Sequence, residues 1–163
     1  MPRYNGATAD MLWLNGQDEA AIDLYKQPSA GGRPLGLARI YAAMGRYAEA
    51  ADSLQQSDAN NYPRGALAKA VRLLRTAPTA AASPRSPPHL GEPGFVHLYV
   101  GAPERVLELY YEENLDDLRP GVSANLIALL WHPTYAPVRK LELFKSLVRK
   151  YGLVDYWRAR GWA

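Results

Sequence analysis

The feature that most constrains this fold is a glycine set between two helix-forming stretches, as in YAAMGRYAEA at residues 41–50. Apolar residues lead up to Gly45, the small Ala50 follows five positions later, and the bulky Leu54 stands four further on. Two other glycines share this spacing: Gly16 with Ala21 and Tyr25, and Gly101 with Val106 and Tyr110. Residues four apart share a helix face, and glycine tolerates the left-handed backbone of a tight turn. Each glycine is therefore predicted to turn one helix back onto another, with the small residue at their close approach.

Most of the remaining chain has the same helical character. Apolar residues recur at three- and four-residue spacing among strong helix formers, and no alternating strand pattern occurs. We expect helices at 8–15, 17–27, 34–44, 47–58, 63–76, 94–100, 103–115, 121–131, 137–151 and 153–160. Several are too short to be stable alone, so they must pack on neighbours. The predicted fold class is all-α.

A proline-rich stretch interrupts the helices between residues 77 and 93, where five prolines occur. Proline at this density prevents helix formation and favours extended chain. We interpret the stretch as a long surface loop within one helical array, and a ligand for another protein domain is the alternative. The glycine-rich SAGGRPLG at 29–36 is interpreted as a connection between helices, because it lacks the Lys-Ser/Thr ending of a phosphate loop.

Composition limits the functions that fit this chain. The 163 residues contain no cysteine, which excludes disulfides and thiolate metal sites and fits a cytoplasmic protein. No stretch approaches the roughly 18 apolar residues of a membrane span, and the N-terminus lacks the apolar run of a signal peptide. The histidines His89, His97 and His132 do not stand at metal-ligand spacing. The glutamates Glu104, Glu108 and Glu112 fit a solvated helix face. From the histidine spacing and these glutamates together, we expect no metal, no cofactor and no enzymatic activity.

Charge is unevenly distributed along the chain, whose net charge is +3. Residues 104–117 contain six acidic side chains against Arg105. Residues 139–160 contain seven basic side chains against Glu142 and Asp155. The two stretches are interpreted either as solvated faces of opposite sign or as a polar surface that selects a partner by charge.

The glycine-centred units resemble the tetratricopeptide repeat (TPR). The unit at 34–62 matches best, because it has Leu37, Ala38, Tyr41, Gly45, Tyr47, Ala50 and Leu54 in the family's order and spacing. Units at about 5–28 and 94–115 match less completely, and Gly16 lies 29 residues before Gly45 where the family repeats every ~34. The resemblance implies one domain over 1–163, a degenerate TPR-like array of helix pairs that forms a right-handed α-solenoid. Other helix-pair repeats and a plain helical bundle remain open alternatives.

The last third of the chain is similar to segments that end TPR regions of bacterial regulatory proteins. The matching residues are Leu130, Trp131, His132, Pro133, Arg139, Phe144, Gly152, Leu153, Tyr156, Trp157, Arg158, Gly161 and Trp162. This resemblance implies helices at 121–163 that cap the apolar end of the array, with an aromatic partner-binding patch at the tip as the alternative. The chain is then either a stand-alone repeat protein or one region of a longer regulator.

The TPR resemblance implies a non-catalytic adaptor that holds a protein, peptide or helix partner in a concave groove. The groove side chains implied by analogy are Asp10, Trp13, Arg39 and Tyr99. The main alternative is nucleic-acid binding through the basic C-terminal helices, whose aromatic residues could stack on bases. An enzyme with an unrecognised polar pocket is a third hypothesis, and self-association through the groove or the tip is compatible with all three.

Overall fold

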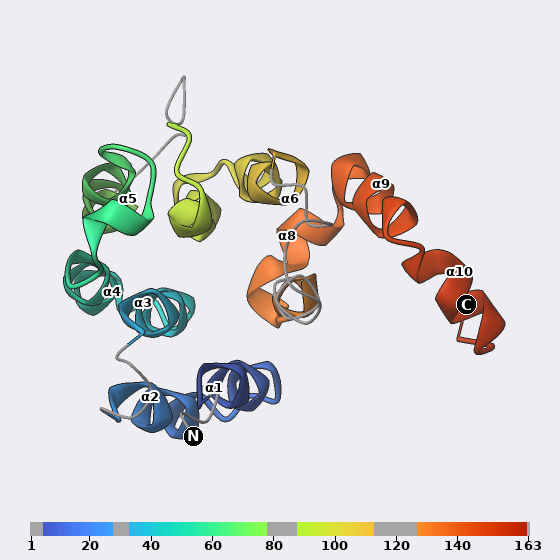
Figure 1. The fold of residues 1–163 in the computed structure, drawn as a ribbon, viewed down its shortest axis with the longest axis horizontal. Helices are drawn as coiled ribbons and strands as arrows, with labels where there is room; N and C mark the ends of the chain where they lie inside the picture. The colour runs from blue at the N-terminus through green and yellow to red at the C-terminus, as the bar shows by residue number, and fades with distance from the viewer. Residues whose placement is uncertain (1–4, 28–32, 78–87, 113–126, 163) are drawn as a thin grey trace.

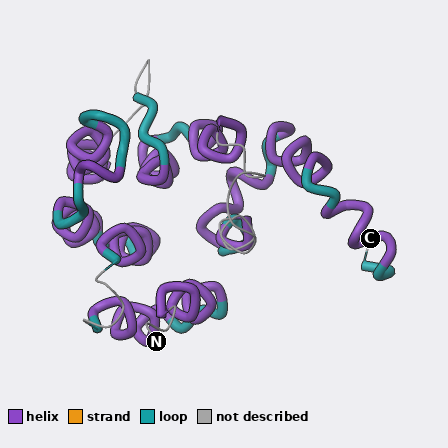
Figure 2. Tube along the Cα trace, viewed as in Figure 1, coloured by secondary structure: helices purple, strands orange, loops and turns teal. Residues whose placement is uncertain are grey.

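The computed structural model describes residues 5–27, 33–77, 88–112 and 127–162, and within these ranges every regular element is helical (Figures 1 and 2). This confirms the all-α fold class for the described residues. The elements are α1 (Asn5–Leu14), α2 (Asp18–Lys26), α3 (Pro34–Ala43), α4 (Tyr47–Gln55), η2 (Ala59–Asn61), α5 (Ala66–Thr76), η4 (Glu92–Val100), η5 (Pro103–Leu107), α6 (Glu108–Glu112), η6 (Pro133–Tyr135), α8 (Ala136–Arg139), α9 (Glu142–Lys150) and α10 (Leu153–Ala159), where η denotes a 3₁₀ helix.

The three repeated glycines each end a helix in the same way. Gly16, Gly45 and Gly101 have φ values of 74°, 76° and 73°, in the left-handed region that favours glycine. In each case the amide that follows the glycine donates to a carbonyl five residues earlier. These bonds are Gln17 to Leu12 at 2.9 Å, Arg46 to Tyr41 at 2.8 Å and Ala102 to His97 at 3.0 Å. This bonding satisfies carbonyls that the helix end leaves unpaired, and it confirms the predicted turns.

Successive helices pack as antiparallel neighbours around these turns. α1 packs on α2 and α3 packs on α4, while α5 contacts both α4 and η4. The small and bulky positions that the glycine pattern pairs are all buried, as predicted: Ala21, Ala50 and Val106 with Tyr25, Leu54 and Tyr110. Gly36 allows α3 to pack closely against α2. A Cβ at this position would lie within 3.0 Å of the Tyr25 ring of α2.

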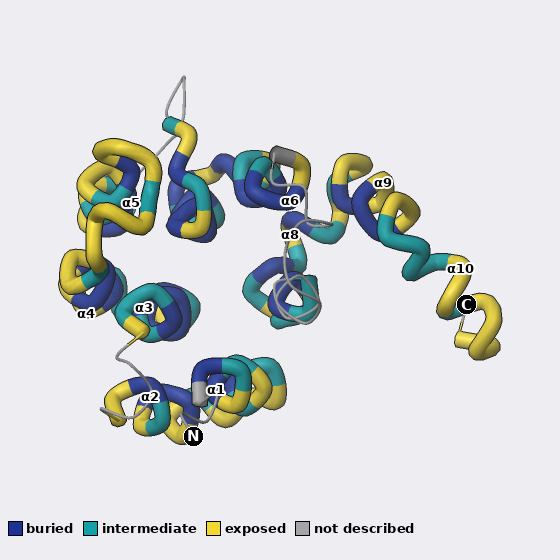
Figure 3. The backbone as a smooth tube through the Cα atoms, in the orientation of Figure 1, coloured by how far each residue is buried: buried dark blue, intermediate teal, exposed yellow. Residues whose placement is uncertain are grey.

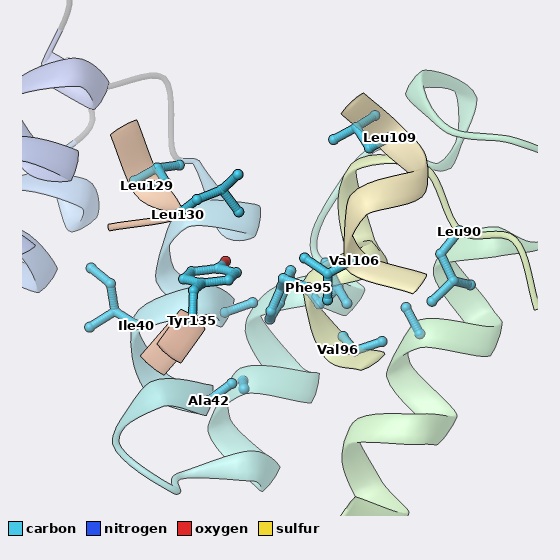
Figure 4. Packing of buried hydrophobic residues seen from close by; sticks show 14 of the residues in the cluster. Ile40, Ala42, Leu90, Phe95, Val96, Val106, Leu109, Leu129, Leu130 and Tyr135 are labelled. Atoms are coloured by element: carbon cyan, nitrogen blue, oxygen red, sulfur yellow. The ribbon is translucent and has the colours of Figure 1, made fainter. Parts of the chain in front are cut away.

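The elements from α1 to α6 follow an arc, and the segment 127–139, which includes η6 and α8, lies inside it (Figure 1). One continuous apolar cluster joins the arc to this segment. Figure 4 shows Leu129, Leu130 and Tyr135 gathered near Ile40 of α3 and Phe95 of η4. α9 and α10 then extend away from the arc, and the dark blue of buried residues disappears along α10 (Figure 3).

The helix expected at 137–151 is in fact two helices, so that prediction is wrong. α8 ends at Arg139, and Leu141 has an extended backbone with φ −74° and ψ 142° before α9 begins. The break has a physical reason, because the Arg139 guanidinium ties α8 to the preceding turn. It donates to the carbonyls of Leu130 at 2.6 Å and His132 at 2.8 Å. α8 is therefore fixed inside the arc, and the chain must change direction to leave it.

Part of the proline-rich stretch also differs from the surface loop that the sequence predicts. Residues 78–87 lie outside the described residues, but Leu90 is 1% exposed and Pro93 is buried. The Pro88 carbonyl lies 3.0 Å from Nε2 of the buried His97. The helix expected at 94–100 is present as the 3₁₀ helix η4, which begins at Glu92. Pro93 lies in the first turn of this helix. The end of the proline-rich stretch therefore belongs to the core. Leu90 and Pro93 are buried there, and the Pro88 carbonyl accepts a hydrogen bond from His97.

Candidate functional site

The first candidate site is the inner face of the arc, where three polar side chains from three helices meet. The Tyr25 hydroxyl of α2 donates to Oδ1 of Asp10 on α1 at 2.6 Å. The Arg39 guanidinium of α3 lies 3.6 Å from the same oxygen and 5.9 Å from the centroid of the Phe95 ring. Burial and the Asp10 carboxylate raise the pKa of the Tyr25 hydroxyl, which remains a donor at neutral pH.

The segment 127–139 covers this network from inside the arc. The Trp13 ring, 1% exposed, stacks on His132 with centroids 3.9 Å apart and also meets Tyr135 edge to face at 6.4 Å. The turn that presents His132 is held by its own contacts. His132 Nδ1 lies 3.0 Å from the Thr134 hydroxyl, and Arg139 binds the His132 carbonyl. Burial lowers the pKa of the His132 imidazole, which favours the neutral ring stacked on Trp13.

The four residues that the TPR resemblance assigns to a groove fall in two places. Asp10, Trp13 and Arg39 come together on the inner face, where they contact other residues of the same chain. Tyr99 is half-buried in a separate contact, edge to face with Tyr47 at 5.5 Å. A small open pocket remains beside Arg39, lined by Phe95, Tyr110, Leu129 and Tyr135 among others.

Opening the inner face would require a large amount of free energy. The buried side chains of the covering segment are Leu129, Leu130, Tyr135 and Val138. Each contributes roughly 1.5–3 kcal/mol when fully buried, so removing all four would cost about 6–12 kcal/mol. Whole domains are stable by only about 5–15 kcal/mol. The segment is therefore part of the folded core, and a partner would have to replace these buried contacts to reach the inner face.

The second candidate site is the C-terminal face, which we define as the exposed surface of α9 and α10 together with Trp131. No residue of α10 is buried. Tyr156 and Trp162 are 47% and 69% exposed, and Trp131 is 40% exposed. Phe144, Leu147 and Val148 of α9 are buried in the apolar cluster. The aromatic residues beyond them remain in contact with solvent.

The exposed rings of the C-terminal face are ordered by contacts with one another. Trp131 meets Trp157 edge to face at 5.9 Å and packs on Phe144 at 5.6 Å. Tyr156 meets Trp162 edge to face at 5.9 Å, with the Arg160 guanidinium 5.4 Å from the Tyr156 ring centroid. The backbone supports this arrangement, because the Trp162 amide donates to the Trp157 carbonyl at 2.9 Å, beside Gly161. The result is a preorganised aromatic surface with cations at its edge.

Other kinds of site find little support in the parts of the chain that the structure describes. No three His, Asp or Glu side chains gather there in a way that could hold a metal ion. His89 lies beside Glu108 at 3.6 Å, His97 is in the core, and His132 is on Trp13. None of the described helices is both long enough and apolar enough to cross a membrane.

Comparisons with known proteins do not assign this chain to a family. The chain matches no protein-family model, no curated protein and no solved structure.

Sequence reasoning missed the role of three inner residues. Tyr25 is predicted only as core, and the structure adds its hydrogen bond to Asp10. The sequence places His132 only in the C-terminal third and gives Tyr135 no role, whereas both pack on Trp13 of α1. The available signal was the compact WHPTY at 131–135, in which aromatic residues surround a proline that helps to form a tight turn.

Proposed function

We propose that this protein is a non-catalytic interaction module, built as a degenerate TPR-like α-solenoid, that binds a protein partner through its C-terminal face. The solenoid proposal is supported by three glycine turns of one geometry and by helices that pack on successive neighbours along an arc. It differs from the usual groove-binding arrangement, because the inner face is filled by residues 127–139.

A single observation carries the functional proposal, namely that no residue of α10 is fully buried, since Leu153, Val154 and Trp157 pack only partly against the core. Isolated helices shorter than about 12–15 residues are marginal in water, and most helical stability in proteins comes from burying an apolar face. α10 also presents Tyr156, and Trp162 lies just beyond the turn at Arg160 and Gly161 that follows the helix. Tyrosine and tryptophan are enriched among residues that dominate binding energy at protein interfaces. A partner would stabilise α10 by covering these rings.

Site-directed photo-crosslinking tests this proposal. A photo-reactive phenylalanine analogue replaces Trp162 in the protein expressed in its native cells, and Met11 carries the analogue in the control. Met11 is a suitable match because it is 52% exposed and lies on α1, far along the chain from α10. We expect a discrete adduct from position 162 that is absent from position 11. Equal or absent adducts at the two positions would contradict the proposal.

Nucleic-acid binding is the second candidate, and it is favoured by the seven basic against two acidic side chains at residues 139–160. Binding of this kind would weaken steeply with salt, because phosphate contacts release counterions. Titration of fluorescent oligo(dT) and of a duplex at about 50 and 200 mM salt measures it. No binding at the lower salt concentration excludes this candidate.

A further inference from the structure

This inference rests on the proposed function and specifies the partner. We propose that the C-terminal face binds an acidic protein segment that carries an apolar anchor residue. Seven basic and two acidic side chains lie in residues 139–160, although the whole chain has a net charge of only +3. Positive charge is thus concentrated beside the exposed rings, while the rest of the chain is net negative.

The two carboxylates of the C-terminal face are already engaged. Glu142 pairs with Lys145, and Asp155 lies 3.7 Å from Arg158. Four exposed cations of this stretch remain, Lys140, Arg149, Lys150 and Arg160, and no carboxylate of the described residues lies in ion-pair distance of them. Lys150 and Arg160 instead lie over the rings of Tyr151 and Tyr156, at 5.6 and 5.4 Å from the centroids. These contacts hold the cations close to the aromatic surface and leave their N–H groups available to a partner.

Charge complementarity therefore selects the partner's chemistry. Carboxylates placed beside Arg149, Lys150 and Arg160 would form charge-assisted hydrogen bonds, and arginine can bind a carboxylate with two N–H groups. An aliphatic or aromatic side chain of the same segment would cover the exposed rings of Trp131 and Trp162. An anchor surrounded by charged contacts is the usual anatomy of a protein interface.

A second copy of the chain is a poorer occupant of this face. In a symmetric dimer the same patch lies on both subunits, so residues of one copy meet the same residues of the other. Such a contact would place the unpaired cations of one copy opposite those of the other. Like charges brought together at an interface oppose association.

The ring geometry also favours a protein over a nucleic acid. Base stacking needs an open aromatic face. The rings here are packed edge to face, with interplanar angles of 73° for Trp131 and Trp157 and 85° for Tyr156 and Trp162, and each such contact covers one face of one ring. Arg160 also lies over the Tyr156 ring. Leu143, which is 40% exposed, adds an aliphatic contact that suits an apolar side chain better than a base.

The test selects peptides from a displayed library of random 16-residue sequences on the full chain. Peptides that also bind the double variant Y156A/W162A are removed. We expect the retained peptides to have a net negative charge and at least one large apolar residue. Their affinity, measured by fluorescence anisotropy, should fall about tenfold or more for K150E/R160E, as for lost interfacial charge pairs. M11A should bind like the wild type, and thermal melting shows whether each variant remains folded.

The outcomes separate this inference from the proposed function. Retained peptides that are neutral or basic would overturn the acidic partner and leave the interaction module standing. Failure to retain any peptide over Y156A/W162A would overturn both. Binding of oligo(dT) in preference to every peptide would assign the face to nucleic acid and also overturn both. A charge-swap pair gives a positive check, because K150E/R160E should bind a selected peptide in which lysine replaces each acidic residue.

Discussion

His97 is expected to make this protein sensitive to mild acid. The side chain lies on η4 and is 1% exposed. Since a carbonyl can only accept, Nε2 carries the proton and donates to the Pro88 carbonyl at 3.0 Å. Nδ1 is buried with no hydrogen-bond partner among the described residues. Burial lowers the pKa of His97 from 6.5 to about 4, and the nearby Arg105 adds to the shift, whereas the Pro88 bond and Glu104 oppose it.

The size of the effect follows from proton linkage. The unfolded chain takes up a proton at His97 as the pH falls below about 6.5, while the folded protein does so only near pH 4. The folded pKa is the lower one, so the stabilisation is present above pH 6.5 and is lost as the pH falls to 4. One unit of pKa shift corresponds to about 1.4 kcal/mol, which gives a loss of about 3 kcal/mol between these limits. This is a large share of the 5–15 kcal/mol typical of a domain.

Urea unfolding at pH values from 7 to 4 measures this loss, with H97F as the non-titrating variant. We expect the free energy of unfolding of the wild type to fall by about 3 kcal/mol more than that of H97F over this range. H97F retains a smaller slope from His132, whose pKa burial also lowers. Parallel curves for the wild type and H97F would refute the reasoning.

Three further predictions concern stability, and each is measured by urea unfolding at pH 7. G36A should destabilise the fold by about 1–3 kcal/mol, since the new methyl group would overlap the Tyr25 ring. G94A is the control, and it should change stability by less than about 0.5 kcal/mol because its Cβ meets open space. Equal effects of the two would contradict the close packing. G45A should cost about 1–2 kcal/mol because its φ is 76°, and a neutral result would contradict the turn. R139Q should cost about 2–3 kcal/mol by removing two charged hydrogen bonds to carbonyls, and wild-type stability would show that they do not hold the turn.

The parts of the fold that depend on local sequence could be predicted closely. Gly45 specifies its turn because the left-handed conformation is a property of one residue and its neighbours. The burial of Ala50 and Leu54 follows from helix periodicity and needs no knowledge of distant segments. The same reasoning could not find the break between α8 and α9. That break depends on hydrogen bonds from Arg139 to a turn seven to nine residues away.

The site was harder to predict because it depends on contacts between distant parts of the chain. Asp10, Trp13 and Arg39 have the spacing of groove residues, and the structure does bring them to one face. Nothing in the local pattern shows that His132, more than a hundred residues later, would cover Trp13. Burial of aromatic residues could be expected from composition, but the partner of each ring could not.

The inner and outer faces differ in what a partner would have to displace, and this difference supports the proposed choice of the C-terminal face. Reaching Trp13 would mean removing the buried side chains of residues 127–139, at about 6–12 kcal/mol. That cost would cancel most of the roughly 8–12 kcal/mol of a micromolar to nanomolar complex. Covering Trp162 displaces mostly water, since this side chain is 69% exposed in the free chain. Since residues 127–139 fill the inner face, the proposed binding at the C-terminal face would spend less free energy on displacing the protein's own chain.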